Sequence, residues 1–136
     1  MSIILRNNYG AVAVNKGVME RMIIEDLLGM SDVLMLCNKK GKIIKDKHTP
    51  FIDPDYYDAL EYSEKRNEVR IRIYIIVKKD VNISDLAERI FNTVEDDFRM
   101  LRLEKPEQIS LKVKGITGLL ADETVKRNIE VIRKNV

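Results

Sequence analysis

Residues 68–79 read EVRIRIYIIVKK, and their alternation is the strongest structural signal in the chain. β-branched residues occupy every second position: Val69, Ile71, Ile73, Ile75 and Val77. Successive side chains of a strand point to opposite faces, so this pattern predicts a strand with one face in the core. The opposite face would be mixed, with Arg70, Arg72, Tyr74, Ile76 and Lys78.

The stretch that follows predicts a helix and a second strand. Asn82 or Ser84 can cap the helix, because their side chains accept hydrogen bonds from free backbone N–H groups. The apolar residues recur at helical spacing: Leu86, Ala87, Ile90, Phe91, Val94, Phe98 and Leu101. After Pro106, the alternation of Ile109, Leu111 and Val113 with polar residues predicts a strand over 109–114.

The first part of the chain predicts a similar order. Residues 11–14, AVAV, alternate as a strand, and residues 16–28 carry a wide apolar helical stripe. Residues 33–37 form an apolar strand, and a turn at 38–41 leads to a short strand at 42–44. Residues 45–67 lose periodicity and contain Pro50 and Pro54, so we expect a long loop with a helical turn near 57–63.

The last segment is interpreted as a helix that Asp122 caps. Its apolar residues, Val125, Ile129, Ile132 and Val136, would form one stripe. We therefore expect one α+β domain over residues 1–118, with the 45–67 loop, and a helical extension over 119–136. The sheet would be mainly antiparallel with two helices on one face, in the order β-α-β-(β)-β-α-β plus a C-terminal helix.

Composition narrows the class of protein. The hydrophobic share is 45%, the charged share is 34% and the net charge is +2, which are the values of a globular domain without a strong basic excess. The single cysteine excludes an internal disulfide and fits a reducing compartment. No stretch approaches the ~20 apolar residues that span a bilayer, and residues 1–10 lack a signal-peptide core. We expect a cytoplasmic protein without a transmembrane segment.

Side chains suited to catalysis or metal binding are sparse. His48 is the only histidine and lies in the irregular loop, whereas Cys37 lies in an apolar strand, where a free cysteine is usually a small core residue. The acidic cluster of Asp53, Asp55 and Asp58 lacks the glycine and glutamate of a calcium-binding loop. We expect no enzymatic activity, no cofactor and no metal.

One face of the sheet could bind a partner. If the strands at 69–78 and 109–114 are neighbours, the face combines basic residues with one aromatic: Arg70, Arg72, Tyr74, Lys112 and Lys114. Single-stranded RNA modules of βαββαβ order stack bases on two or three aromatic side chains of such a face. Only Tyr74 is available here, so RNA binding is the alternative hypothesis and a solvated or protein-binding face is the first.

A family resemblance supports that preference. Residues 69–94, VRIRIYIIVKKDVNISDLAERIFNTV, resemble the alkaline-shock (Gls-type envelope stress response) family of Gram-positive bacteria. Residues 81–83, VNI, match its turn, residues 109–116, ISLKVKGI, match its closing strand, and residues 9–18, YGAVAVNKGV, are similar to its opening segment. Asp80 replaces the glycine of the family's turn, and the family's Thr-Gly step after the second helix is missing, so the chain would be a divergent member.

The resemblance implies a non-enzymatic scaffold protein of the envelope stress response. Such a protein would form homo-oligomers and bind a protein partner, including a membrane-anchored one, so that it could lie at the inner face of the membrane. The resemblance carries no catalytic residue over to this chain. Within this hypothesis, the interaction surface combines the sheet face with the apolar residues Val125, Ile129 and Ile132 of the last segment.

Overall fold

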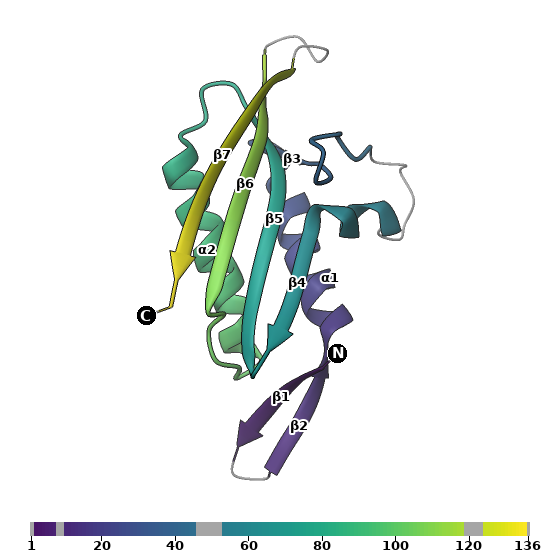
Figure 1. The fold of residues 1–136 in the computed structure, drawn as a ribbon, viewed down its shortest axis with the longest axis vertical. Helices are drawn as coiled ribbons and strands as arrows, with labels where there is room; N and C mark the ends of the chain where they lie inside the picture. Colours follow the sequence, from purple (N-terminus) through teal and green to yellow (C-terminus); the bar gives the residue numbers. More distant parts are fainter. Residues whose placement is uncertain (1, 8–9, 46–52, 119–123, 136) are drawn as a thin grey trace.

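The chain folds as an α+β protein whose mixed, mostly antiparallel sheet has five strands (Figure 1). The computed structural model describes residues 2–7, 10–45, 53–118 and 124–135, and side chains from residue 16 onward. Its elements are β1 (Ser2–Asn7), β2 (Gly10–Asn15), α1 (Lys16–Leu28), β3 (Leu34–Leu36), the 3-10 helix η1 (Pro54–Ala59), β4 (Leu60–Lys65), β5 (Glu68–Lys78), α2 (Ile83–Met100), β6 (Gln108–Thr117) and β7 (Thr124–Lys134).

Strand β5 is the centre of the sheet. The short strand β3 and the strand β4 pair with the two halves of one side of β5, both antiparallel. Strand β6 pairs with the other side in parallel, after the crossover through α2, and β7 pairs antiparallel with β6. The strand expected over 69–77 is therefore confirmed, and so is its pairing with the strand at 109–114.

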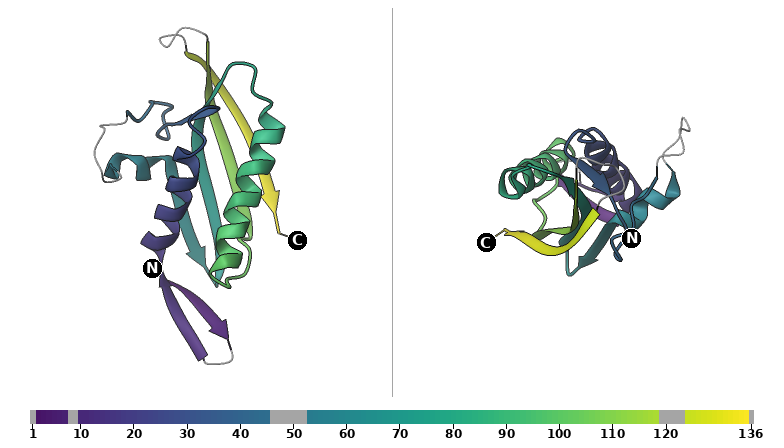
Figure 2. Two further views of the ribbon diagram at one scale, coloured as in Figure 1. Left: turned by 180° about the vertical axis from the view of Figure 1, so that it is seen from behind. Right: turned by 90° about the horizontal axis from the view of Figure 1, so that it is seen from above.

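Both helices cover the same face of the sheet, which we call the inner face (Figure 2). All the alternate apolar residues of β5 from Val69 to Val77 are buried there, and they pack in one core with Leu111, Ile24 and Phe98. Asn82 caps α2 by accepting a hydrogen bond from the Asp85 backbone N–H at 3.1 Å. The predicted inner and outer faces of this strand are thus correct.

Two predictions about the middle of the chain are wrong. Within the expected loop at 45–67, residues 60–65 form the strand β4, and the helical turn lies at 54–59 rather than 57–63. Arg66 and Asn67 connect β4 to β5 with φ angles of 54° and 65°, which is the left-handed geometry that a tight two-residue hairpin needs. Residues 42–44 form no strand, and Ile43 makes only an isolated bridge with Cys37.

The expected C-terminal helix is also wrong, because the segment is the strand β7. Ile129 and Val131 lie opposite Val113 and Leu111 of β6, so they extend the inner face of the sheet. β-branched residues favour strands, and the two-residue spacing of Ile129 and Val131 outweighs the helical spacing of Val125, Ile129 and Ile132. Since β7 belongs to the main sheet, residues 124–134 are not an extension added to a domain ending at residue 118. Asp122 and Val136 lie outside the described residues.

The first two strands form a hairpin that leads directly into α1. Their register places Ile3 opposite Val14 and Leu5 opposite Val12. The hairpin lies beyond the end of the main sheet (Figure 1), and α1 continues from β2 without a loop. The expected strand at residues 11–14 and helix at residues 16–28 are both confirmed.

Candidate interaction surface

The outer face of the sheet, opposite the helices, carries most of the residues that the sequence predicts for an interaction surface. In the parallel pairing of β5 and β6, Arg72 lies opposite Ser110 and Tyr74 lies opposite Lys112. Arg70 lies opposite Gln108 in the same register. The predicted convergence of Arg70, Arg72, Tyr74 and Lys112 on one face is therefore present.

Three basic side chains of this outer face are paired with carboxylates from other segments. Arg70 donates through Nε and Nη2 to Glu107 at 3.1 and 3.4 Å, and Arg72 donates through Nη1 to Glu61 at 3.3 Å. Lys112 forms an ion pair with Glu130 of β7. The hydrogen bond from Arg70 also lowers the pKa of Glu107. Arg70, Arg72 and Lys112 are thus each neutralised by a carboxylate, which weakens the basic field that phosphate binding favours.

Tyr74 is not available as a stacking platform. The residue is only 3% exposed, and it packs with Cys37 and Ile76 in a small second core on the outer face. Its hydroxyl donates a hydrogen bond to Glu61 at 2.8 Å. The sequence correctly placed Tyr74 on this face, but its aromatic surface is used for packing.

Lys114 lies at an irregularity of β6 beside a tight turn. The parallel register with β5 shifts between Val113 and Gly115, so Lys114 is the extra residue. Gly41 has a φ of +86°, and a Cβ added there would lie 3.4 Å from the Lys114 Cβ. Lys114 therefore belongs to the end of the outer face where the 38–42 turn crosses it.

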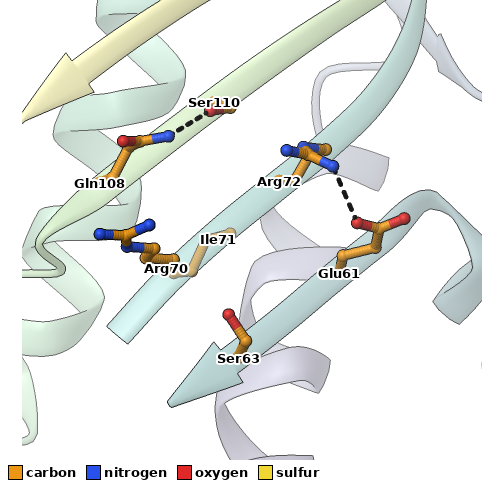
Figure 3. Close-up of a pocket in the computed structure, with 7 residues that line it drawn as sticks. All are labelled: Glu61, Ser63, Arg70, Ile71, Arg72, Gln108 and Ser110. Atoms are coloured by element: carbon orange, nitrogen blue, oxygen red, sulfur yellow. Dashed lines mark hydrogen bonds and ion pairs between the residues drawn. The ribbon is translucent and has the colours of Figure 1, made fainter. Parts of the chain in front are cut away.

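A hollow of about 270 Å³ lies between β4, β5 and β6 on the outer face (Figure 3). Its lining residues are mostly polar: Glu61, Ser63, Arg70, Ile71, Arg72, Gln108 and Ser110. The Gln108 amide donates to the Ser110 hydroxyl at 3.1 Å. The Arg72 Nε is enclosed by the protein, so it lies out of reach of an occupant of the hollow. Because its lining is mostly polar, the hollow is suited to a polar side chain of a partner molecule.

The apolar residues nominated from the last segment do not form one stripe. Val125 and Ile129 lie opposite Ile116 and Val113 on the inner face, whereas Ile132 lies opposite Ser110 on the outer face. Val125 is 51% exposed and Ile132 is 43% exposed. Because a strand alternates between faces, residues that a helix would align are distributed here over both sides of the sheet.

Cys37 has the environment of a core residue. It is fully buried, and burial raises the pKa of its thiol to about 12. The thiolate is the nucleophilic form of cysteine, so this thiol is unreactive at neutral pH. His48 lies outside the described residues.

We predict that the Cys37 thiol of the folded protein reacts with a thiol reagent such as DTNB only after unfolding. The physical reason is the combination of burial and a protonated thiol. The measurement compares the reaction rate with and without denaturant. Fast labelling of the folded protein would contradict the placement of Cys37 in a closed core.

A pair of carboxyl groups lies between the two helices, away from the outer face. Burial raises the pKa of Asp26 in α1 to about 8, and the nearby Asp97 of α2 adds a hydrogen bond and charge repulsion in the same direction. Asp97 is 7% exposed. Two carboxyl groups in such a site favour a shared proton, so Asp26 is protonated at neutral pH.

We predict that this pair makes the stability depend on pH. The unfolded chain releases the Asp26 proton near its ordinary pKa of 3.8, whereas the folded protein holds it to about pH 8. The free energy of unfolding therefore decreases as the pH rises between these values and then levels off. Asp26→Asn removes the dependence, so the variant should gain melting temperature relative to the wild type as the pH rises. Parallel pH profiles would contradict the assignment.

Comparisons of the chain with models of protein families, with curated proteins and with solved structures found no match. Within the described residues, no group of three or more His, Cys, Asp or Glu side chains could hold a metal ion. No helix in the described part of the chain is long and apolar enough to cross a membrane.

Sequence reasoning missed the acidic half of the outer face. Glu61, Glu107 and Glu130 come from β4, from the residue before β6 and from β7, and each forms an ion pair with a nominated cation. Their partners are distant in sequence, so only the strand order reveals the pairs. The alternation of Leu60 and Tyr62 before a two-residue turn was the one signal for β4, and with it for Glu61.

Proposed function

We propose that this protein is a non-catalytic interaction protein that associates with itself and binds a partner protein through the outer face of its sheet. The observation that carries the proposal is the set of three ion pairs on the outer face, in which Arg70, Arg72 and Lys112 each lie against a carboxylate. Paired charges around a small polar hollow give directional contacts and reject mismatched partners. They give little attraction to a polyanion, whose phosphates would have to displace the carboxylates.

The resemblance to the alkaline-shock family supports the same proposal. The segments that carry the resemblance fold as β2 with α1, as β5 with α2, and as β6. On this basis we propose a divergent relative of that family, working in the cytoplasm in envelope stress or homeostasis. A membrane-anchored partner protein would bring it to the inner face of the membrane.

A charge-reversed variant tests the outer face. Arg72→Glu places a carboxylate beside Glu61 and the hollow, whereas the control Arg99→Glu changes an exposed pair on α2, on the other side of the molecule. We expect the wild type and the Arg99 variant to capture the same protein from a host lysate, and the Arg72 variant to lose it. Treatment with ribonuclease should have no effect.

Two outcomes would contradict the proposal. Equal capture by both variants would exclude the outer face as the binding surface. Recovery of RNA in a salt-sensitive complex that Arg72→Glu abolishes would favour the RNA-binding alternative, because phosphate contacts release counterions and weaken with salt.

A further inference from the structure

Strand β7 leaves one long edge of the sheet without a partner. It hydrogen-bonds to β6 along one side, and no strand in the described part of the chain pairs with its other side (Figure 1). The edge extends over Thr124–Lys134 and contains no proline or glycine, although the pairing of β7 with β6 is irregular at Arg127 and Asn128. An edge of this kind is a template for another strand, which would satisfy its free backbone groups.

The side chains of β7 are compatible with a second copy of the same strand. In a two-fold antiparallel pair centred on Asn128, Lys126 of each copy lies opposite Glu130 of the other. Both residues lie on the outer face. Lys126 lies opposite Gly115, which pairs with the outer-face residue Ile76, and Glu130 lies opposite Lys112. Opposite charges directly across an antiparallel pair stabilise it.

The same register places Val125 of each copy opposite Val131 of the other, and both residues face the helix side through their pairing with Ile116 and Leu111. It also places Arg127 opposite Ile129. Val125 is half-exposed in the single chain, so a second copy would cover apolar surface.

Neighbouring registers are less favourable. A pair centred on Arg127 places two guanidinium groups together, a pair centred on Ile129 places Lys126 opposite the apolar Ile132, and a pair centred on Glu130 places two carboxylates together. Registers centred between two residues would place the inner face of one copy beside the outer face of the other, so those registers are excluded. Charge and apolar complementarity therefore select the pair centred on Asn128.

We propose that two copies of this chain associate through their β7 edges in this register, which joins their sheets into one. The inference rests on the self-association proposed above and identifies the surface through which two copies associate. Glu130 would then lie between Lys112 of its own chain and Lys126 of the second copy. The two outer faces would form one continuous surface with a hollow on each half, so a partner with two binding segments would gain avidity.

Two charge reversals and their mixture test the register. Lys126→Glu places two carboxylates opposite each other at both equivalent contacts of the dimer. Glu130→Lys places two ammonium groups opposite each other at both. Sedimentation velocity should therefore show each variant as a monomer at concentrations where the wild type is a dimer. An equimolar mixture should recover the dimer, because every contact in a mixed pair again joins a carboxylate to an ammonium group.

The outcomes separate this inference from the proposed function. If the wild type is dimeric and both variants remain dimeric, or if the mixture stays monomeric, the β7 interface is wrong while self-association stands. If the wild type itself is monomeric, both self-association and this interface fail. Circular dichroism of each variant is the folding control, because Glu130→Lys also removes the half-buried Lys112–Glu130 pair within the chain.

Discussion

Replacing Ile73 by aspartate is expected to unfold the protein. Ile73 is fully buried at the centre of β5, between Leu60 of β4 and Leu111 of β6. A buried carboxyl group without a partner costs several kcal/mol, against a total stability of about 5–15 kcal/mol. A thermal melt followed by circular dichroism should show no cooperative transition, or one far below that of the wild type.

The matched control is Arg72→Ala, one position away on the outer face. It removes an ion pair in which both side chains are more than 40% exposed, at 43% and 45%, so the expected loss is at most about 1 kcal/mol. A larger loss from Arg72→Ala than from Ile73→Asp would mean that the two faces of β5 are exchanged.

Removal of β7 is expected to have the second-largest effect on stability. A chain that ends at Gly118 lacks the partner of β6 and the half-buried Ile129 and Val131, which pack against the main core. Loss of this apolar burial alone is on the order of 3 kcal/mol, which lowers the melting temperature by about 10 °C. The exposed β6 edge should also promote aggregation.

The control for the truncation is Val125→Thr, which keeps the strand and changes a half-exposed side chain. It should melt within a few degrees of the full chain. A truncated protein that is soluble and melts together with the wild type would show that β7 contributes nothing to the fold. It would also remove the basis for pairing through its edge.

The sequence predicted the elements whose pattern has a single interpretation. Strand β5 has β-branched residues at every inward position, and α2 combines a cap at Asn82 with a regular apolar stripe. Both were correct to within one or two residues. In each case the local preference and the tertiary packing favour the same structure, so the sequence alone was sufficient.

The errors fall where local preference and packing disagree. In β7, the positions of Val125, Ile129 and Ile132 fit a helix, but β6 offers a full-length strand partner that the sequence does not reveal. In β4, the connection to β5 is Arg66–Asn67 rather than the Asn-Gly or Asp-Gly of most tight hairpins, so the turn was missed.

The sequence predicted only the cations of the candidate surface, for the same reason. The cations of β5 and β6 follow from alternation, since both strands were identified. The carboxylates that neutralise them come from β4 and β7, the strands that were missed, and from the residue before β6. The sequence therefore revealed the cations without the carboxylates that pair with three of them.

Sedimentation velocity of the wild-type protein, mixed with a labelled single-stranded RNA of random sequence, distinguishes a self-associating interaction protein from an RNA-binding module. The two signals report the size of the protein and the fate of the RNA in one experiment. We expect the protein to change from monomer to dimer as its concentration rises, while the RNA sediments as the free strand. A protein that stays monomeric at every concentration and carries the RNA with it would instead be an RNA-binding module, and the proposed function would be wrong.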